Sequence, residues 1–192
     1  SDTAILSIFG NDPRVCYTGR SVLEAAGMGI ALPENGISFR VNLCAVEDTP
    51  GGLVIHSHNG GNVHGAQAVT LMNDLITAPA FAAKLKDAGL TIHVTDTFRH
   101  IGVMVSKAKD LQAVKLTEPH NVLEQPVEPH LPKMAADTAD EAARKLCADI
   151  RELMLLSYDT LKDHPVNRER AARGELPANM IWPWGAATAM KL

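Results

Sequence analysis

The chain has 192 residues, of which 46% are hydrophobic and only 4% aromatic, and its formal net charge is −4. This length and apolar content fit one ordinary domain whose core is filled mainly by aliphatic side chains. The negative charge excludes nucleic acid as a general partner, because no basic surplus can neutralise a phosphate backbone. No apolar run approaches the roughly 20 residues of a membrane helix, and no signal peptide is visible. The cysteines, Cys16, Cys44 and Cys147, lack CxxC spacing, which indicates free thiols in a reducing cytoplasm.

Apolar periodicity, together with glycine and proline at the breaks, predicts the elements of the first half. Residues 1–19 carry turn residues after a short apolar start. The expected elements are a helix at 20–28, strands at 37–46 and 53–57, and helices at 63–75 and 80–87. Pro79 separates the last two helices, and Gly89 ends the second.

The second half predicts further strands and one long helix. Paired strands are expected at 90–95 and 99–107, another strand at 111–116, a proline-studded loop at 119–132 and a helix at 138–161. Asp140 and Glu141 stand at the positive N-terminus of that helix. Strands in pairs with helices between them indicate an α+β fold, with a mostly antiparallel or mixed sheet and helices packed on one face.

The segment 164–185 concentrates both tryptophans, three arginines, two asparagines and several prolines. Arg168 and Arg170 offer planar guanidinium groups suited to phosphate or carboxylate, and Asn167 and Asn179 add neutral donors. The prolines and Gly174 predict that much of this segment is fixed loop. The alternative is that the tryptophans fill a core and the arginines are solvated.

Three histidines form the best local metal pattern. His56 and His58 stand two apart on a predicted strand, and His64 could add a third zinc ligand. No acidic residue is close in sequence, so surface histidines beside a turn are the favoured alternative. In the following turn, Asn62 is expected to cap the next helix rather than to help bind an anion.

Six stretches, in the same order along the chain, resemble one family. They are SDTAILSIFGNDP at 1–13, YTGRSVLEA at 17–25, ISFRVNL at 37–43, FRH at 98–100, PHN at 119–121 and the segment 164–185 that begins HPVNRER. Each is similar to a motif of the archaeal-type 2,3-bisphosphoglycerate-independent phosphoglycerate mutases. The matches cover nearly the whole chain, and six in order are far more specific than any one alone.

The resemblance implies a metal-assisted enzyme of the alkaline phosphatase superfamily that interconverts 3-phosphoglycerate and 2-phosphoglycerate through a phosphoserine. Ser1 matches the nucleophile of that family, which also touches two divalent ions, usually manganese, with zinc or magnesium as alternatives. The other metal ligands would lie outside this chain, so we expect none of these ions to bind tightly to it alone. Ser1 could instead be a residue left by cloning.

The resemblance also implies residues that bind phosphoglycerate or a similar small phosphorylated acid. They are Arg20, Arg40, Asn42, Arg99, His100, His120, Asn167 and Arg168. A phosphate and a carboxylate both need charge-assisted donors. The alternative is that Arg20 pairs with Glu24 on the same helix and that Arg99 lies on an exposed face.

The expected organisation is a substrate-binding domain inserted into a catalytic core that this chain lacks. Residues 1–19 would lead from that core, residues 20–178 would form the α+β domain, and residues 179–192 would return. Apolar residues left uncovered at both ends could drive formation of a homodimer; they are Ile5, Leu6, Ile8, Ile181 and Trp184.

Departures from the family motifs leave other functions open. Ile5, Ser21-Val22 and Ala186-Ala187 stand where the family usually has other residues. Another phosphotransferase or a phosphonate-handling enzyme of the same superfamily is therefore one alternative. A stand-alone, non-catalytic anion-binding module is the other.

Overall fold

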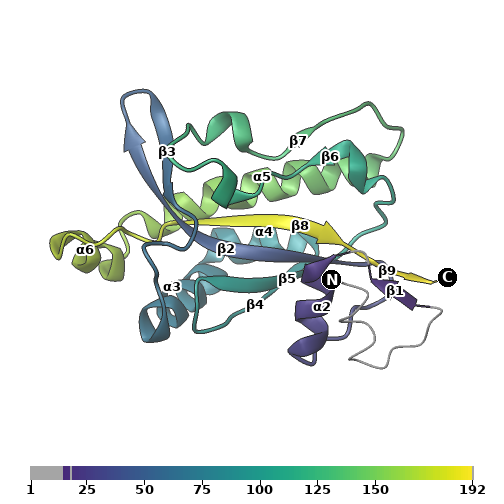
Figure 1. The fold of residues 1–192 in the computed structure, drawn as a ribbon, viewed down its shortest axis with the longest axis horizontal. Coiled ribbons are helices and arrows are strands. Elements are labelled where there is room, and N and C mark those ends of the chain that lie inside the picture. The colour runs from purple at the N-terminus through teal and green to yellow at the C-terminus, as the bar shows by residue number, and fades with distance from the viewer. Residues whose placement is uncertain (1–14, 18, 192) are drawn as a thin grey trace.

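The computed structural model describes residues 15–17 and 19–191 (Figure 1). Its described part contains five α-helices: α2 (Arg20–Gly27), α3 (Gly65–Thr77), α4 (Pro79–Ala88), α5 (Glu141–Leu161) and α6 (Pro165–Ala172). Five strands form the main sheet: β2 (Gly36–Thr49), β3 (Gly52–Ser57), β4 (Leu90–His93), β5 (Arg99–Val105) and β8 (Met180–Ala187). Strand β9 (Ala189–Lys191) lies outside this sheet. The shorter elements are β1 (Val15–Tyr17), η1 (Leu111–Ala113), β6 (Val114–Lys115), η2 (Pro119–Asn121), η3 (Glu128–His130) and β7 (Lys133–Met134).

The long strand β2 organises a five-stranded sheet in which every pairing is antiparallel. It pairs with β5 along one edge and with β8 along the other, and its far end turns back into β3. Strand β4 extends the sheet beyond β5. The predicted α+β class and antiparallel sheet are therefore confirmed.

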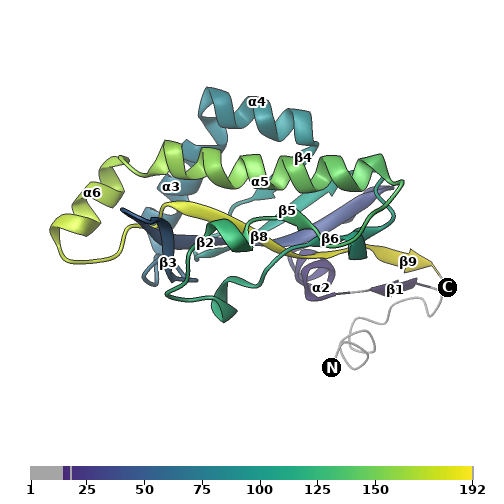
Figure 2. The ribbon, with the colours of Figure 1, turned by 90° about the horizontal axis from the view of Figure 1, so that it is seen from above.

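Helices α3, α4 and α5 stack on one face of this sheet, as Figure 2 shows. Fully buried aliphatic and aromatic side chains from both layers form one core. Helix α2 lies on the opposite face, where Ala25 packs against Ile101 and Val103 of β5. The Ser21 hydroxyl also lies 2.8 Å from that of Ser38 on β2. The second face is therefore only partly covered, by α2 at one end and by the chain around β6 and β7.

Local chemistry explains most helix ends. Asp140 caps α5, because its carboxylate accepts a hydrogen bond of 3.1 Å from the Ala143 N–H. Pro79 opens α4 at a position where a missing N–H costs nothing, and Gly89 ends it with a positive φ of 68°. The prediction that Asn62 caps α3 is wrong. The helix begins after His64, and Asn62 itself has a φ of 59°.

Two sequence predictions for the irregular regions need correction. The strand expected at 111–116 is the turn η1 followed by the two-residue strand β6, which pairs only with β7. Much of the segment 164–185 is expected as fixed loop, but α6 (Pro165–Ala172) forms near its start and its last residues belong to the strand β8. Its Pro183 is tolerated because β8 has no further neighbour in the described sheet, so its missing N–H lies at an edge.

The described chain ends lie side by side. Strand β1 pairs antiparallel with β9, with Val15 opposite Lys191. The expectation that Ile181 and Trp184 are exposed is wrong, since β2 and the surrounding chain bury both. Ile5, Leu6 and Ile8 lie outside the described residues. The apolar surface expected to drive formation of a homodimer therefore has no exposed member among the described residues. No helix of the described part is long and apolar enough to cross a membrane.

Candidate functional site

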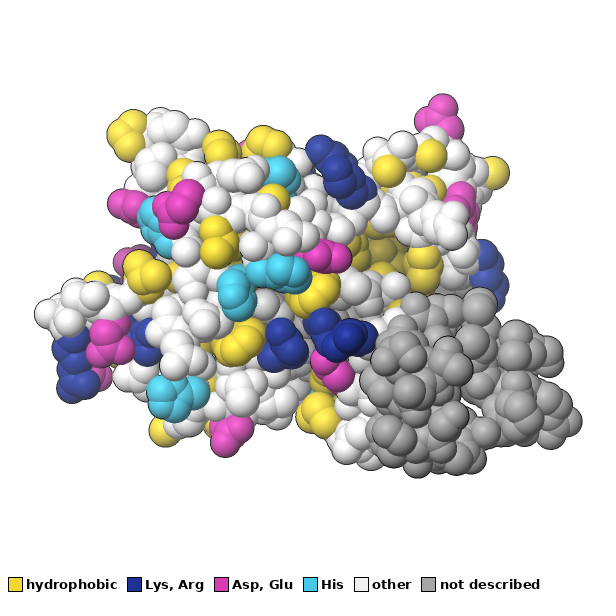
Figure 3. Space-filling view, in the orientation of Figure 1, with side chains coloured by type: hydrophobic (Ala, Val, Ile, Leu, Met, Phe, Trp, Pro, Cys, Tyr) yellow, Lys and Arg dark blue, Asp and Glu magenta, His cyan; other side chains and the backbone are white. Residues whose placement is uncertain are grey.

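The partly covered face of the sheet carries a cluster of polar and aromatic side chains. Arg40 and Asn42 stand two residues apart on β2, so both point to this face. Arg99 on β5 is directly opposite Asn42, and Trp184 on β8 is opposite Arg40. We call the cluster the arginine face; its members are Glu24, Arg40, Asn42, His58, Phe98, Arg99, His120 and Trp184. Figure 3 shows Lys or Arg and His side chains gathered near the middle of this surface.

One carboxylate links the two arginines. Glu24 on α2 forms an ion pair with Arg40 through Oε1, and the same oxygen lies 3.9 Å from Nη1 of Arg99. The Arg40 guanidinium lies 5.0 Å from the centre of the Trp184 ring, and that of Arg99 lies 5.4 Å from the Phe98 ring. Both cations therefore rest on aromatic surfaces that fix their positions.

The cluster also contains buried polar atoms that are not satisfied. Within the described residues, Glu24 Oε2, Arg40 Nε and Arg99 Nε are buried and have no hydrogen-bond partner. Such groups are uncommon in folded proteins because each loses its interaction with water. Two guanidinium groups with spare donors at one place form a site suited to an oxyanion.

A short hydrogen-bond chain positions the aromatic wall of the site. The Trp184 indole donates to Asn42 Oδ1 over 3.0 Å, and the Asn42 amide nitrogen donates to the His58 carbonyl over 2.9 Å. Asn42 is fully buried, so its side chain serves to hold Trp184 and the turn after β3. These two hydrogen bonds fix the position of the Trp184 ring, against which the Arg40 guanidinium lies.

Two histidines complete the site. The His58 and His120 rings meet edge to face at 6.1 Å between centroids, and the His120 ring meets Trp184 at 5.4 Å. Burial lowers the pKa of His58, and the nearby His120 and Arg99 lower it further. His58 is therefore neutral near pH 7, and a negatively charged ligand would favour its protonation.

Shallow cavities adjoin the arginine face. One of about 360 Å³ is lined by Glu24, Met28, Thr97, Phe98, Arg99 and Ile101. Another of about 220 Å³ runs along Trp184 and Gly185 toward Leu111 and Leu116. Both have room for a small molecule.

Of the eight residues predicted to bind substrate, the structure brings together Arg40, Asn42, Arg99 and His120. Arg20 is exposed on the first turn of α2 and Glu24 turns away toward Arg40 and Arg99. His100 lies on the other face of β5, fully buried, where its Nδ1 accepts a hydrogen bond of 3.0 Å from the Thr95 N–H. Burial lowers the pKa of His100 to about 4.

The other two predicted residues lie at the far end of the molecule, on α6. Asn167 is buried and donates to the carbonyls of Leu161 and Ala178, while its own carbonyl accepts from the Ala178 N–H. Arg168 is exposed. Asn167 therefore closes the turn between α5 and β8, away from the arginine face.

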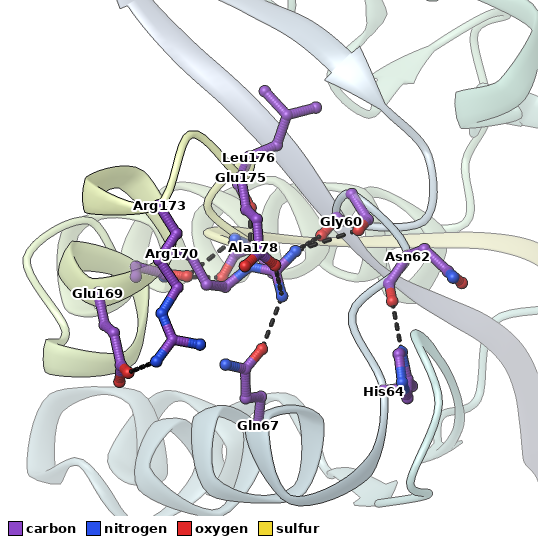
Figure 4. Close-up of polar contacts among 12 residues, drawn as sticks. Gly60, Asn62, His64, Gln67, Glu169, Arg170, Arg173, Glu175, Leu176 and Ala178 are labelled. Atoms are coloured by element: carbon purple, nitrogen blue, oxygen red, sulfur yellow. Dashed lines mark hydrogen bonds and ion pairs between the residues drawn. The ribbon is translucent and has the colours of Figure 1, made fainter.

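Arg170 forms a buried brace rather than an anion site (Figure 4). Its guanidinium donates to the carbonyls of Leu176, Gly60 and Gly61 and to the Gln67 side chain, at 2.6–3.1 Å. The interpretation of Arg170 as a guanidinium group that binds phosphate or carboxylate is wrong, because these acceptors already occupy its N–H donors. The brace ties α6 to the β3–α3 turn.

The histidine pattern at 56–64 does not form a zinc site. His56 lies between Glu47 and Glu124, at 2.6 Å and 2.9 Å, and both carboxylates raise its pKa. His64 contacts the Asn62 carbonyl. Among the described residues, no group of three or more His, Cys, Asp or Glu is arranged to hold a metal ion. Ser1 lies outside the described residues, so its predicted role is not placed.

Sequence reasoning missed four members of the site, among them Trp184, which it treated as an apolar residue of the core or of an uncovered end. Glu24 was paired with Arg20 by helical spacing, Phe98 was only a neighbour of Arg99, and His58 was grouped with the wrong partners. The one usable signal was the FRH motif at 98–100, where an aromatic residue precedes an arginine at the start of a strand.

Comparisons with known proteins agree on one family. The family described as "2,3-bisphosphoglycerate-independent phosphoglycerate mutase" matches residues 1–167. A probable enzyme of that name from Geobacter sulfurreducens is 35% identical over 192 residues, which is the whole chain but 43% of the relative. One from Methanothermobacter thermautotrophicus is 35% identical over 185 residues and is covered to 40%.

A solved structure supports the fold. The cofactor-independent phosphoglycerate mutase from Thermoplasma acidophilum superposes with a TM-score of 0.67 at 23% identity. The match covers 99% of this chain and 47% of that one. The chain thus spans less than half the length of the proteins it matches.

Proposed function

This chain belongs to the 2,3-bisphosphoglycerate-independent phosphoglycerate mutase family, and we propose that it is the substrate-gripping domain of such an enzyme. The full-length protein would interconvert 3-phosphoglycerate and 2-phosphoglycerate in the cytoplasm. The curated relatives are more than twice as long as the part matched here, which leaves room for a separate catalytic core.

The observation that carries this proposal is the meeting of Arg40 and Arg99 beside unsatisfied buried donors. Both phosphoglycerates carry a phosphate and a carboxylate on a three-carbon chain. Charge-assisted hydrogen bonds to such groups contribute about 1.5–3 kcal/mol each. One guanidinium would hold the phosphate or carboxylate, with Asn42, His58 and His120 close by.

In this scheme the domain positions the glycerate while the phosphoryl group moves between its two hydroxyls. Transfer would run through a phosphoserine at Ser1 with two divalent ions, manganese, zinc or magnesium, bound by the catalytic core. The described residues offer no ligand set for these ions. The contribution of this chain is therefore orientation and charge, which lower the barrier by holding the reactants in line.

The paired chain ends support the inserted arrangement. Because β1 and β9 run antiparallel side by side, the chain enters and leaves the domain at one place. Insertions of this kind need neighbouring ends. We propose that residues 1–19 and the chain after β8 connect the domain to the core in the same full-length chain. Strand β8 falls in the segment 179–192 that was expected to return to the core, but its pairing with β2 makes it part of the domain expected at 20–178.

Calorimetric titration of the 192-residue chain with 3-phosphoglycerate tests this proposal. We expect Arg40→Ala and Arg99→Ala each to weaken binding by roughly 10- to 150-fold, the equivalent of one charge-assisted contact. Arg168→Ala, which removes an exposed arginine on α6, is the matched control and should bind like the parent. If Arg40→Ala and Arg99→Ala bound 3-phosphoglycerate as tightly as the parent and Arg168→Ala, that result would contradict the proposed site.

The same titration separates the alternatives. A phosphonate that binds more tightly than 3-phosphoglycerate would favour a phosphonate-handling enzyme. Equal affinity for sulfate, phosphate and 3-phosphoglycerate would favour a plain anion-binding module, because the glycerate would then contribute nothing.

A further inference from the structure

The least expected member of the arginine face is Glu24. A carboxylate beside two arginines lowers their attraction for any other anion. The formal charges of Arg40, Arg99 and Glu24 sum to +1, whereas the two arginines alone would give +2. A doubly charged phosphate ester therefore meets a site that is partly neutralised from within.

The geometry of the Glu24 contacts is not that of an optimised structural ion pair. Only Oε1 meets the two guanidinium groups, and Oε2 is buried without a partner among the described residues. Nε of both arginines is likewise unused. Structural Arg–carboxylate pairs commonly use two parallel hydrogen bonds instead. The arrangement therefore leaves one donor of each guanidinium group unused.

The surroundings allow the Glu24 side chain to leave while α2 stays in place. The helix is held by other residues: the Ser21 hydroxyl donates to the Gly185 carbonyl over 2.7 Å, and Ala25 packs on β5. The Glu24 side chain is 29% exposed and lines the cavity of about 360 Å³ beside Phe98. A rotation of its side chain toward that cavity would free both arginines.

We propose that Glu24 is an internal counter-ion that occupies the anion site of Arg40 and Arg99 and is displaced when an oxyanion binds. This inference rests on the proposed function, since it assumes that the two arginines receive the ligand. While it occupies the site, Glu24 would lower the affinity of the two arginines for singly charged anions. It would favour a ligand with enough charge to displace it. It acts as a specificity-determining residue.

Glu24→Gln tests this idea, because it keeps the size and hydrogen bonding of the side chain and removes its charge. Inorganic phosphate and acetate are titrated into the 192-residue chain by calorimetry. We expect the variant to bind phosphate roughly tenfold more tightly than the parent and to bind acetate more tightly as well. Glu118→Gln is the matched control, because Glu118 lies 3.2 Å from His120 on the same face but touches neither arginine.

The outcomes separate the two proposals. If Glu24→Gln binds phosphate equally or more weakly than the parent while Arg40→Ala loses binding, Glu24 merely positions the arginines and the counter-ion idea fails alone. If Glu118→Gln gains as much as Glu24→Gln, the effect is general electrostatics, and the idea also fails. If neither the parent nor any variant binds phosphate or 3-phosphoglycerate, both proposals fail.

Thermal unfolding of each variant shows whether it is folded. Should Glu24→Gln unfold, Glu24→Asp takes its place, since the shorter side chain draws the carboxylate back from the arginines. Tighter phosphate binding by Glu24→Asp would support displacement, and unchanged or weaker binding would overturn it.

Discussion

At the scale of single residues, burial decides which histidines carry charge. His58 has a lowered pKa because burial, His120 and Arg99 all disfavour its protonated form. A bound anion would offset those positive charges and raise that pKa, so binding would take up a proton. The affinity for an anion should therefore increase as the pH falls.

Sulfate is the suitable probe for this effect, because its own charge is constant between pH 5 and pH 8. We expect sulfate to bind the 192-residue chain several-fold more tightly at pH 5.5 than at pH 7.5. His58→Asn should flatten the dependence on pH. An affinity for sulfate that is independent of pH in the parent would argue against a role for His58.

His100 makes a separate prediction about stability. Its pKa is lowered to about 4 in the folded protein, while the unfolded chain titrates near 6.5. Below pH 6.5 the unfolded state binds a proton at His100, whereas the folded state stays unprotonated there until the pH approaches 4. The free energy of unfolding should therefore fall by roughly 3 kcal/mol between pH 7 and pH 4 from this residue alone.

Urea unfolding of His100→Asn at both pH values checks this. The Asn carbonyl can still accept from the Thr95 N–H, although the variant will be less stable at pH 7 because it loses packing. Its loss of stability between pH 7 and pH 4 should be smaller than that of the parent by about that 3 kcal/mol. An identical loss in both proteins would show that His100 is not the acid-sensitive group.

At the scale of elements, Arg170 is the main tie between α6 and the β3–α3 turn. The Arg170 side chain is 4% exposed, and its guanidinium contacts neighbouring chain segments, Glu175 included at 3.4 Å. Arg170→Lys keeps the charge and removes the fork of donors. We expect it to lower the free energy of unfolding by about 2–4 kcal/mol, because several buried carbonyls lose their partner.

The exposed neighbour Arg168 provides the control for that measurement by urea unfolding. Arg168→Lys should change the free energy of unfolding by no more than about 0.5 kcal/mol. A similar effect of both substitutions would mean that the brace contributes little.

The elements also show what the sequence could and could not predict. Helices α4 and α5 were predicted closely because Pro79, Gly89 and Asp140 act on their own neighbours. Strand β8 was missed because its pairing partner, β2, lies about 140 residues earlier and no local pattern announces it. The same reason hid Glu24, whose helical spacing pointed to Arg20 while the fold gave it partners on β2 and β5.

Arg40 was predictable for the opposite reason. A charged residue among apolar neighbours on a strand needs a specific environment, and the structure supplies Glu24 and Trp184. His100 and Asn167 share the same kind of motif but turn inward. A motif thus identified important residues without distinguishing those that face a ligand from those that hold the fold.

At the scale of the whole molecule, the chain spans less than half the length of the relatives it matches, and we propose that a separate core completes the enzyme. We expect the 192-residue chain by itself to convert no 3-phosphoglycerate to 2-phosphoglycerate, with or without added manganese, because a catalytic metal centre needs several ligands. A coupled assay on protein free of contaminating mutase measures this. Turnover by the chain alone would show that it carries a complete active site.

We propose that the arginine face receives phosphoglycerate, and the two tryptophan indoles report on this binding directly. Trp184 donates to Asn42 inside the site, whereas Trp182 donates to the Thr117 carbonyl. In ¹⁵N-labelled chain, with the two indole signals assigned by Trp→Phe variants, 3-phosphoglycerate should shift the Trp184 signal in a saturable way and move the Trp182 signal less. The Arg40→Ala/Arg99→Ala double variant should lose the shift. A Trp184 signal that does not move, or one that moves equally in the double variant, would contradict the account.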